Sequence, residues 1–263
     1  MSEKKRLIEN KRGQVTIFII IAILVIAVVV LIYLLFPKIK STVETQTQSP
    51  NEYIQTCISE KLKETVDNVA LHGGIYNPSD SISYRYLGEN INYICYTNQY
   101  YTPCVVQEPL LLQTMRTEIK NEISDDVNSC FGSLVQSYEN NGYDASLKYA
   151  NTESVVELLP SRIVVTFENE LTLTKDETET YTDFSSVELS SKLYDLYGVA
   201  MSIMTWEELY GSAPVSVYMN YYPDLLIQTH LDLDGTRVYM VEDLESGDQL
   251  NFAIRSLVVP PGY

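Results

Sequence analysis

Residues 51–74 read NEYIQTCISEKLKETVDNVALHGG, and their pattern predicts a helix that begins the folded part of the chain. The apolar residues of this stretch recur at steps of three or four and therefore share one helix face: Ile54, Ile58, Leu62, Val66 and Val69. We expect Asn51 to cap the helix and Gly73, which tolerates a left-handed backbone, to end it. His72 is interpreted as a last-turn residue that complements the helix dipole.

Upstream, residues 14–36 form an apolar run without Asp, Glu, Lys, Arg or His. As a helix this run would extend roughly 34 Å, enough to cross a hydrocarbon core of about 30 Å. Five Lys or Arg residues precede the run and two follow it closely, which predicts a cytoplasmic N-terminus and an extracellular remainder. We therefore predict a single-pass cell-membrane protein whose partner along residues 14–36 is the lipid bilayer.

The chain is expected to divide into four parts. They are a basic cytoplasmic segment at 1–13, a transmembrane helix at 14–36, a polar stalk at 37–50 and an extracellular α+β region at 51–263. The last region is long enough for one large domain or for two sub-lobes, 51–150 and 151–263.

Residues 11–18, KRGQVTIF, lie at the inner edge of the apolar run. They resemble the class III processing site of archaeal type IV pilin-like precursors. The resemblance implies cleavage by a prepilin-type peptidase between Gly13 and Gln14, followed by packing of the apolar helix in a filament core. The alternative is a monomeric anchor, which the scarcity of small residues in the run favours, because small residues let membrane helices approach closely.

Four cysteines, Cys57, Cys95, Cys104 and Cys130, fall on the predicted outer side, and an even number there favours two disulfides. Three pairings of four cysteines exist. Cys95 and Cys104 bracket a segment that reads as a strand turning back, so we predict that they pair. Cys57 and Cys130 then pair by elimination, each on a predicted helix. No metal site is predicted, because no C-x-x-C pair occurs and neither histidine has ligand-like spacing to a cysteine.

Tyrosines crowd residues 82–106, where alternating β-branched and aromatic residues predict two or three short antiparallel strands. Half-buried packing on a sheet face is one interpretation of these side chains. The other is a contact surface, since tyrosine is favoured at interfaces. The candidate contact residues are Tyr84, Tyr86, Tyr93, Tyr96, Tyr100 and Tyr101.

Two further helices and more strands complete the predicted extracellular region. A helix after Pro109 carries an apolar stripe from Leu112 to Phe131, and another is marked by apolar residues from Leu189 to Leu209. Strands are expected at 155–159, 162–167, 171–174, 215–220, 225–233, 236–242 and 249–258, with an acidic loop at 175–180. The predicted fold class is α+β: an N-terminal transmembrane helix followed by an extracellular domain of antiparallel sheets and about three helices.

The charge of the chain bears on its partners. The net charge is −17, and residues 14–263 carry 13 Lys or Arg against 33 Asp or Glu, near −20. Nucleic acid is excluded as a partner, because polyanions are bound through clustered Lys and Arg. An unknown extracellular protein, or a second copy of the chain, is the expected partner.

No catalytic motif is present. The sequence has two histidines, no G-x-S-x-G, no H-E-x-x-H and no phosphate-cradling loop, so we predict that it is not an enzyme and needs no cofactor. Asp232-Leu233-Asp234-Gly235 lacks the later ligands of a calcium loop and is interpreted as a hairpin turn.

Residues 57–76, with the cysteine-bearing helix that ends in Gly73-Gly74, and the later helix up to Cys130 resemble a group of archaeal single-pass surface proteins. That resemblance implies location rather than activity. We predict a membrane-anchored, disulfide-stabilised surface protein that mediates protein or cell contacts, with a pilin-like subunit as one form. The alternative is an extracellular module that binds a small solute or a glycan through its tyrosine-rich surface.

Overall fold

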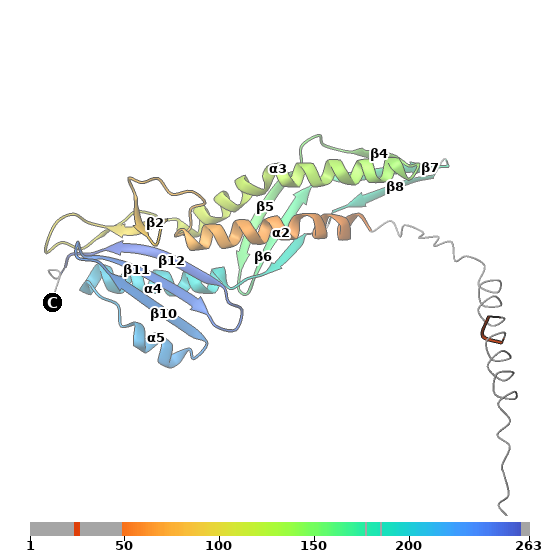
Figure 1. Cartoon of the computed structure of the whole chain (residues 1–263). Coiled ribbons are helices and arrows are strands. Elements are labelled where there is room, and N and C mark those ends of the chain that lie inside the picture. Colours follow the sequence, from red (N-terminus) through yellow and green to blue (C-terminus); the bar gives the residue numbers. More distant parts are fainter. Residues whose placement is uncertain (1–23, 27–48, 177, 185, 259–263) are drawn as a thin grey trace, which may run out of the picture. The chain divides into compact units, whose positions relative to one another are not determined.

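The computed structural model describes residues 24–26, 49–176, 178–184 and 186–258 (Figure 1). The chain divides into two units, Met1–Thr47 and Gln48–Tyr263. In the first unit only residues 24–26, which are helical, are described. All other elements belong to the second unit.

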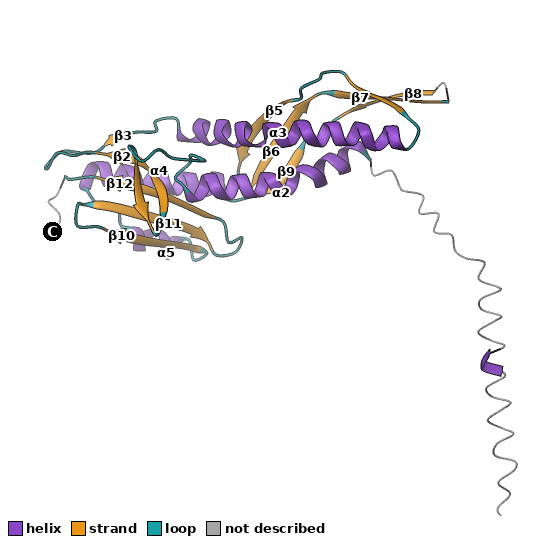
Figure 2. Ribbon diagram, turned by 45° about the horizontal axis from the view of Figure 1, so that its top comes forward, coloured by secondary structure: helices purple, strands orange, loops and turns teal. Residues whose placement is uncertain are grey.

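Two long antiparallel helices form the centre of the second unit, α2 (Pro50–Leu71) and α3 (Leu111–Asn140). Both views show them side by side (Figures 1 and 2). Their facing stripes are buried at steps of three or four, and Leu62, Ile119 and Ile123 are fully buried. The predicted helices are therefore confirmed, although the cap is Ser49, whose hydroxyl accepts from the Glu52 N–H at 3.3 Å, and not Asn51.

A six-stranded sheet lies at one end of the helix pair. Its strands are β1 (Ser83–Tyr86), β2 (Glu89–Tyr96), β3 (Val105–Val106), β10 (Leu225–Leu231), β11 (Thr236–Asp243) and β12 (Gln249–Arg255). The order is β1-β2-β12-β11-β10, with β3 beside the second half of β2. The inner face, with Tyr239, Phe252 and Ile254, packs against α2 and against α4 (Leu193–Tyr210).

Six shorter strands form two sheets that cover the other part of α3. These are β4 (Asp144–Leu147), β5 (Glu153–Leu159), β6 (Arg162–Glu168), β7 (Glu170–Lys175), β8 (Thr178–Asp183) and β9 (Val187–Ser190). They pair as β4-β7-β8 and β5-β6-β9. The ring centroid of Phe131 in α3 lies 5.5 Å from that of Phe167 and 4.6 Å from that of Phe184. These contacts pack the helix against both sheets.

Asn169 lies between β6 and β7, where the backbone hydrogen bonds between strands are interrupted. Its buried side chain makes hydrogen bonds in their place. The side-chain amide donates to the Tyr149 carbonyl at 3.0 Å and to the Thr152 hydroxyl at 2.8 Å. Its oxygen accepts from the Tyr149 N–H at 3.1 Å. The two sheets therefore form one meander that is interrupted and held together at a single amide.

The predicted fold class is wrong in three respects. No helix in the described part of the chain has the length and apolar character needed to cross a membrane. The predicted transmembrane segment 14–36, like the processing site Gly13/Gln14 and the polar stalk, falls outside the described residues except for 24–26 and the last stalk residues. The large sheet is mixed, because β12 pairs with β2 in parallel. The described residues also hold about five helical segments rather than an anchor and three helices.

Three local predictions also need correction. The expected strand at 215–220 is the helix α5 (Val215–Tyr221), which packs beside β10 despite its β-branched residues, since tertiary contacts override weak local propensity. Leu189 belongs to β9 rather than to the third helix. The acidic segment predicted as a loop contains the β7–β8 hairpin.

Both predicted disulfides are confirmed. Cys57 pairs with Cys130, with Cα atoms 6.0 Å apart, and links the first half of α2 to the second half of α3. Cys95 pairs with Cys104 and closes the loop between β2 and β3. No free cysteine remains.

Candidate functional site

Four of the six candidate tyrosines gather on the outer face of the six-stranded sheet, opposite the main core. Tyr84 and Tyr86 come from β1, and Tyr93 and Tyr96 from β2. They pack over a small second apolar cluster made of Ile91, Tyr93, Val238 and Ala253. We call Tyr84, Tyr86, Tyr93 and Tyr96 the tyrosine face.

The rings of the tyrosine face hold one another in fixed orientations. Tyr93 meets Tyr84 and Tyr96 edge-on, with ring centroids 6.4 and 4.9 Å away. Tyr86 lies over His230 of β10 at 4.8 Å. Such offset and edge contacts are the favoured arrangements of aromatic rings, so the face is rigid before any partner arrives.

Three of the four hydroxyls of this face have hydrogen-bond partners within the chain. Tyr84 donates to Asp232 Oδ2 at 2.5 Å, and Tyr93 shares a hydrogen bond of 2.9 Å with Thr236. The Arg255 guanidinium donates to Tyr96 Oη at 3.2 Å. The surface therefore offers ring faces, ring edges and the hydroxyl of Tyr86.

Ionisation of these groups follows from the same contacts. The hydrogen bond to Asp232 raises the pKa of Tyr84 well above its ordinary value and lowers the pKa of the Asp232 carboxyl. Burial raises the pKa of Tyr93. Because both pKa values are raised, Tyr84 and Tyr93 stay protonated at neutral pH and do not act as bases.

The two remaining candidates lie elsewhere. Tyr100 and Tyr101 belong to the loop closed by the Cys95–Cys104 disulfide, and they are 59% and 75% exposed. Tyr101 takes a left-handed backbone at φ 60°, and its N–H donates to the Leu257 carbonyl at 2.7 Å. These two rings project from a loop and are not part of the tyrosine face.

Sequence reasoning missed the C-terminal residues of this face: His230, Asp232, Thr236 and Arg255. They come from β10 to β12 and meet the tyrosines only because β12 lies beside β2. The predicted hairpin turn at Asp232–Gly235 is confirmed, as the Gly235 N–H donates to the Asp232 carbonyl at 3.1 Å. Its role in holding Tyr84 had no local signal in the sequence.

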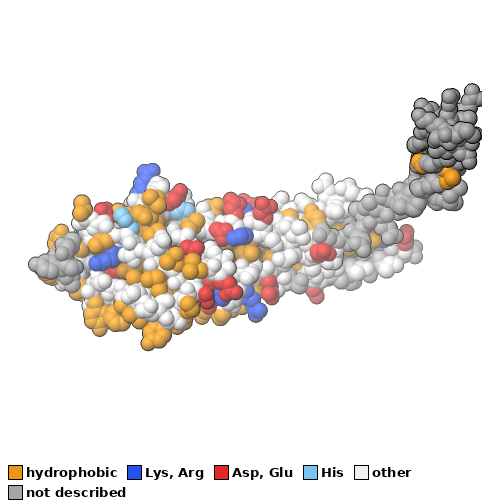
Figure 3. Space-filling model, turned by 60° about the horizontal axis from the view of Figure 1, so that its bottom comes forward, with side chains coloured by type: hydrophobic (Ala, Val, Ile, Leu, Met, Phe, Trp, Pro, Cys, Tyr) orange, Lys and Arg blue, Asp and Glu red, His pale blue; other side chains and the backbone are white. Residues whose placement is uncertain are grey.

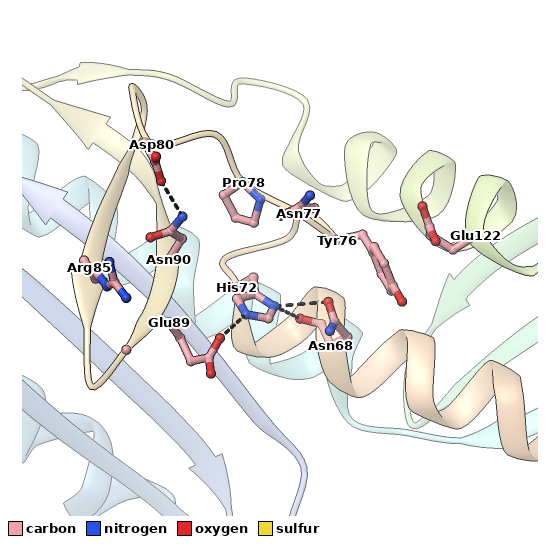
Figure 4. A pocket seen from close by; sticks show the side chains of 11 residues that line it. Asn68, His72, Tyr76, Asn77, Pro78, Asp80, Arg85, Glu89, Asn90 and Glu122 are labelled. Carbon is pink, nitrogen blue, oxygen red and sulfur yellow. Dashed lines mark hydrogen bonds and ion pairs between the residues drawn. The ribbon is translucent and has the colours of Figure 1, made fainter.

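A polar pocket of about 530 Å³ opens where α2 ends (Figure 4). Its walls are the last turn of α2, the loop 76–80, the β1–β2 hairpin and α3; they contribute Asn68, His72, Tyr76, Asp80, Arg85, Glu89, Asn90 and Glu122. His72 Nδ1 lies 2.8 Å from the Asn68 carbonyl oxygen, and His72 Nε2 lies 3.2 Å from Glu89 Oε2. Asn90 donates to Asp80 at 2.8 Å. Side chains from residues 68–90 and from Glu122 of α3 thus line one open pocket.

The chemistry of this pocket is hydrogen bonding. The imidazole of His72 is held between α2 and Glu89, so it orients the wall of the pocket, and no serine, threonine or cysteine is among the pocket-lining residues as a nucleophile. Among the described residues no group of three His, Cys, Asp or Glu side chains could hold a metal ion.

The most deeply buried carboxylate has a structural role. Glu207 of α4 is inaccessible to solvent, accepts hydrogen bonds from the Tyr239 hydroxyl and from Arg237 at 3.1 Å, and its carbonyl accepts from Ser256 at 2.7 Å. Burial raises the pKa of Glu207, and the neighbouring Arg237 opposes that shift. The contacts tie α4 to the sheet without opening to a pocket.

Comparison with known proteins identifies no relative of this chain. The chain matches no family model, no curated protein and no solved structure. Its function must therefore be argued from the geometry described above.

Proposed function

We propose that this chain is a non-enzymatic extracellular protein that binds another protein through its tyrosine face. The two disulfides are compatible with an extracellular protein, since such bonds persist in oxidising surroundings. The observation that carries the proposal is the set of four tyrosine rings on one sheet face. Tyr84, Tyr93 and Tyr96 pack on one another, Tyr86 packs on His230, and residues from β10 to β12 hold them.

The tyrosine face suits a binding surface because its rings are held in place before a partner binds. An aromatic side chain that is already fixed loses little conformational entropy when a partner covers it, so more of the contact energy appears as affinity. Tyr84, Tyr86 and Tyr96 are half-buried in the free protein, and each keeps part of its ring available. Tyrosine is also enriched at the energetic centres of interfaces.

Site-specific photocrosslinking in the cells that make the protein tests this proposal. A benzophenone amino acid placed at Tyr86 should give a covalent adduct of higher mass, whereas the same residue at Tyr149, which is 50% exposed and lies between β4 and β5, should not. Adduct formation at Tyr86 should also fall when Tyr96 is changed to Ala. Equal adducts at both positions, or none at Tyr86, would refute the tyrosine face as the contact surface.

The polar pocket supports a second candidate, the binding of a small polar solute or a glycan. The specific observation is that Asn68, Tyr76, Arg85 and Glu122 line the same open pocket. Neutral sugars are bound by such planar polar groups beside an aromatic ring. Titration with neutral monosaccharides, followed by NMR, should shift the signals of pocket residues in the native protein and not in Arg85→Ala. Arg162→Ala, on a distant strand, serves as the matched control.

A further inference from the structure

The strand β10 is the outer edge of the six-stranded sheet, and it is only partly covered. β10 pairs with β11 along its whole length, from Leu225–Asp243 to Leu231–Arg237. On its other side lies α5, which contacts β10. An uncovered edge strand offers a row of backbone donors and acceptors to any extended chain.

The alternation of hydrogen bonds shows which groups point outward. The Leu225 N–H donates to the Tyr222 carbonyl at 3.0 Å, and the Ile227 N–H points to the Met219 sulfur at 3.5 Å, both away from β11. Because outward groups alternate along a strand, Thr229 and Leu231 also present their N–H and C=O groups outward. Within the described part of the chain these two N–H groups have no acceptor.

The second half of β10 lacks the usual protection of an edge. Residues Gln228 to Leu231 are all exposed, and neither proline nor lysine occurs in the strand. Leu231 and Leu233, at this end of the strand, are 53% and 96% exposed. Tyr221 and Tyr222, which are 78% and 62% exposed, lie at the other end, where the Leu225 N–H donates to the Tyr222 carbonyl. Figure 3 looks onto this side of the molecule, where hydrophobic side chains gather.

The charges near the free half of β10 indicate which kind of extended polypeptide could pair with it. Asp224 precedes the strand and Asp232 follows it, and residues 222–235 contain no Lys or Arg. The nearby arginines are already paired: Arg255 lies 3.7 Å from Asp234, and Arg237, opposite Leu231, lies 3.1 Å from Glu207. A second copy of this chain would bring the same carboxylates and a net charge of −17. Like charges placed together oppose association, whereas a cationic segment would gain from both ends of the edge.

We infer that the free half of β10 binds an extended, positively charged segment of a partner protein as an added strand. Thr229 and Leu231 supply two donors and two acceptors to its backbone. Side chains on one face of the added strand contact Leu231. Those on its other face contact His230, whose ring already stacks on Tyr86. Main-chain pairing gives the affinity, and Asp224 and Asp232 favour lysine or arginine at its ends.

The test uses the full chain and a fluorescent peptide in which Lys and Val alternate. Thr229→Pro removes one outward N–H and leaves the ladder to β11 intact, because that N–H does not point to β11. Peptide affinity, measured by fluorescence anisotropy, should fall at least about tenfold in Thr229→Pro and stay unchanged in Thr229→Ala. The thermal unfolding midpoint of each variant establishes that it is folded.

Two further peptides separate strand addition from general attraction to an acidic protein. A peptide of equal charge that is interrupted by prolines, and one in which Glu replaces Lys, should both bind at least about tenfold more weakly. Equal binding of the proline-interrupted peptide, or of the alternating peptide to Thr229→Pro, would overturn the inference. Protection of the Thr229 and Leu231 amides from hydrogen exchange that rises with protein concentration alone would instead identify a second copy as the occupant and likewise overturn it.

Discussion

The hydrogen bond between Tyr84 and Asp232 joins two residues that are 148 positions apart. It lowers the pKa of the Asp232 carboxyl below 3.8, its ordinary value. A carboxyl whose pKa is lower in the folded state adds stability above the unfolded pKa, and that stability is lost as the pH falls through the folded pKa.

We therefore predict that Tyr84→Phe destabilises the protein near neutral pH and that its deficit shrinks below about pH 4. Urea denaturation at several pH values measures this difference. Tyr86→Phe is the control, because the Tyr86 hydroxyl makes no hydrogen bond with any described residue. A deficit that is the same at all pH values would contradict the assigned role of Asp232.

Gly74, three residues after the end of α2, allows the chain to pass close to the first turn of α3. Its backbone is left-handed at φ 91°, and an added Cβ would lie 2.5 Å from Leu111 Cδ1 and 3.1 Å from Met115 Cε. Gly88 has a similar φ of 99° but open space around it. The two positions separate backbone strain from overpacking.

Gly88→Ala is predicted to cost about 1 kcal/mol through the backbone alone. Gly74→Ala should cost a further 1–3 kcal/mol, roughly, because Leu111 and Met115 must move. Denaturant midpoints of both variants check the difference. Equal losses of stability in the two variants would mean that Leu111 and Met115 move aside without a loss of packing energy.

At the scale of elements, the two disulfides should differ in their contribution. The Cys57–Cys130 bond closes a loop with a sequence separation of 73, and the Cys95–Cys104 bond one of 9. In the chain-entropy description, replacing the first pair by Ser should cost about 4 kcal/mol and replacing the second roughly 2 to 3 kcal/mol. Unfolding of the two double variants by urea measures both, and a larger loss for the short loop would contradict this account.

The junction of β6 and β7 depends on one side chain. Asn169→Ala leaves the Tyr149 backbone groups without their buried partner, and we predict a loss of about 2–3 kcal/mol. Asn90→Ala, which removes one exposed bond to Asp80, should cost about 0.5 kcal/mol or less. Comparable losses for the two variants would show that the interrupted strand has other support.

At the scale of the whole molecule, residues 48–258 share one main apolar core. The largest buried cluster runs from Ile54 of α2 to Ile254 of β12 and includes residues of both smaller sheets. We predict a single cooperative unfolding transition. Fluorescence of Trp206, the sole tryptophan, should change with the same midpoint as far-UV circular dichroism. Two separate midpoints would show that the sheets unfold independently.

The elements whose signals are local can be predicted from the amino-acid sequence. The apolar stripes predicted α2 and α3, because the buried residues on one face of a helix recur every three or four positions. The spacing and placement of the cysteines predicted both disulfides. The crowding of tyrosines in residues 82–106 identified most of the candidate contact surface.

Features that depend on contacts between distant parts of the chain are visible in the folded protein alone. Residues 215–220 have the composition of a strand but form α5, because packing against the sheet outweighs a short local preference. The parallel pairing of β12 with β2 is closed over more than 150 residues, and no local pattern encodes it. That pairing brings Asp232, Thr236 and Arg255 to the tyrosines and leaves half of β10 uncovered, so the candidate site and its neighbouring edge exist only in the folded chain.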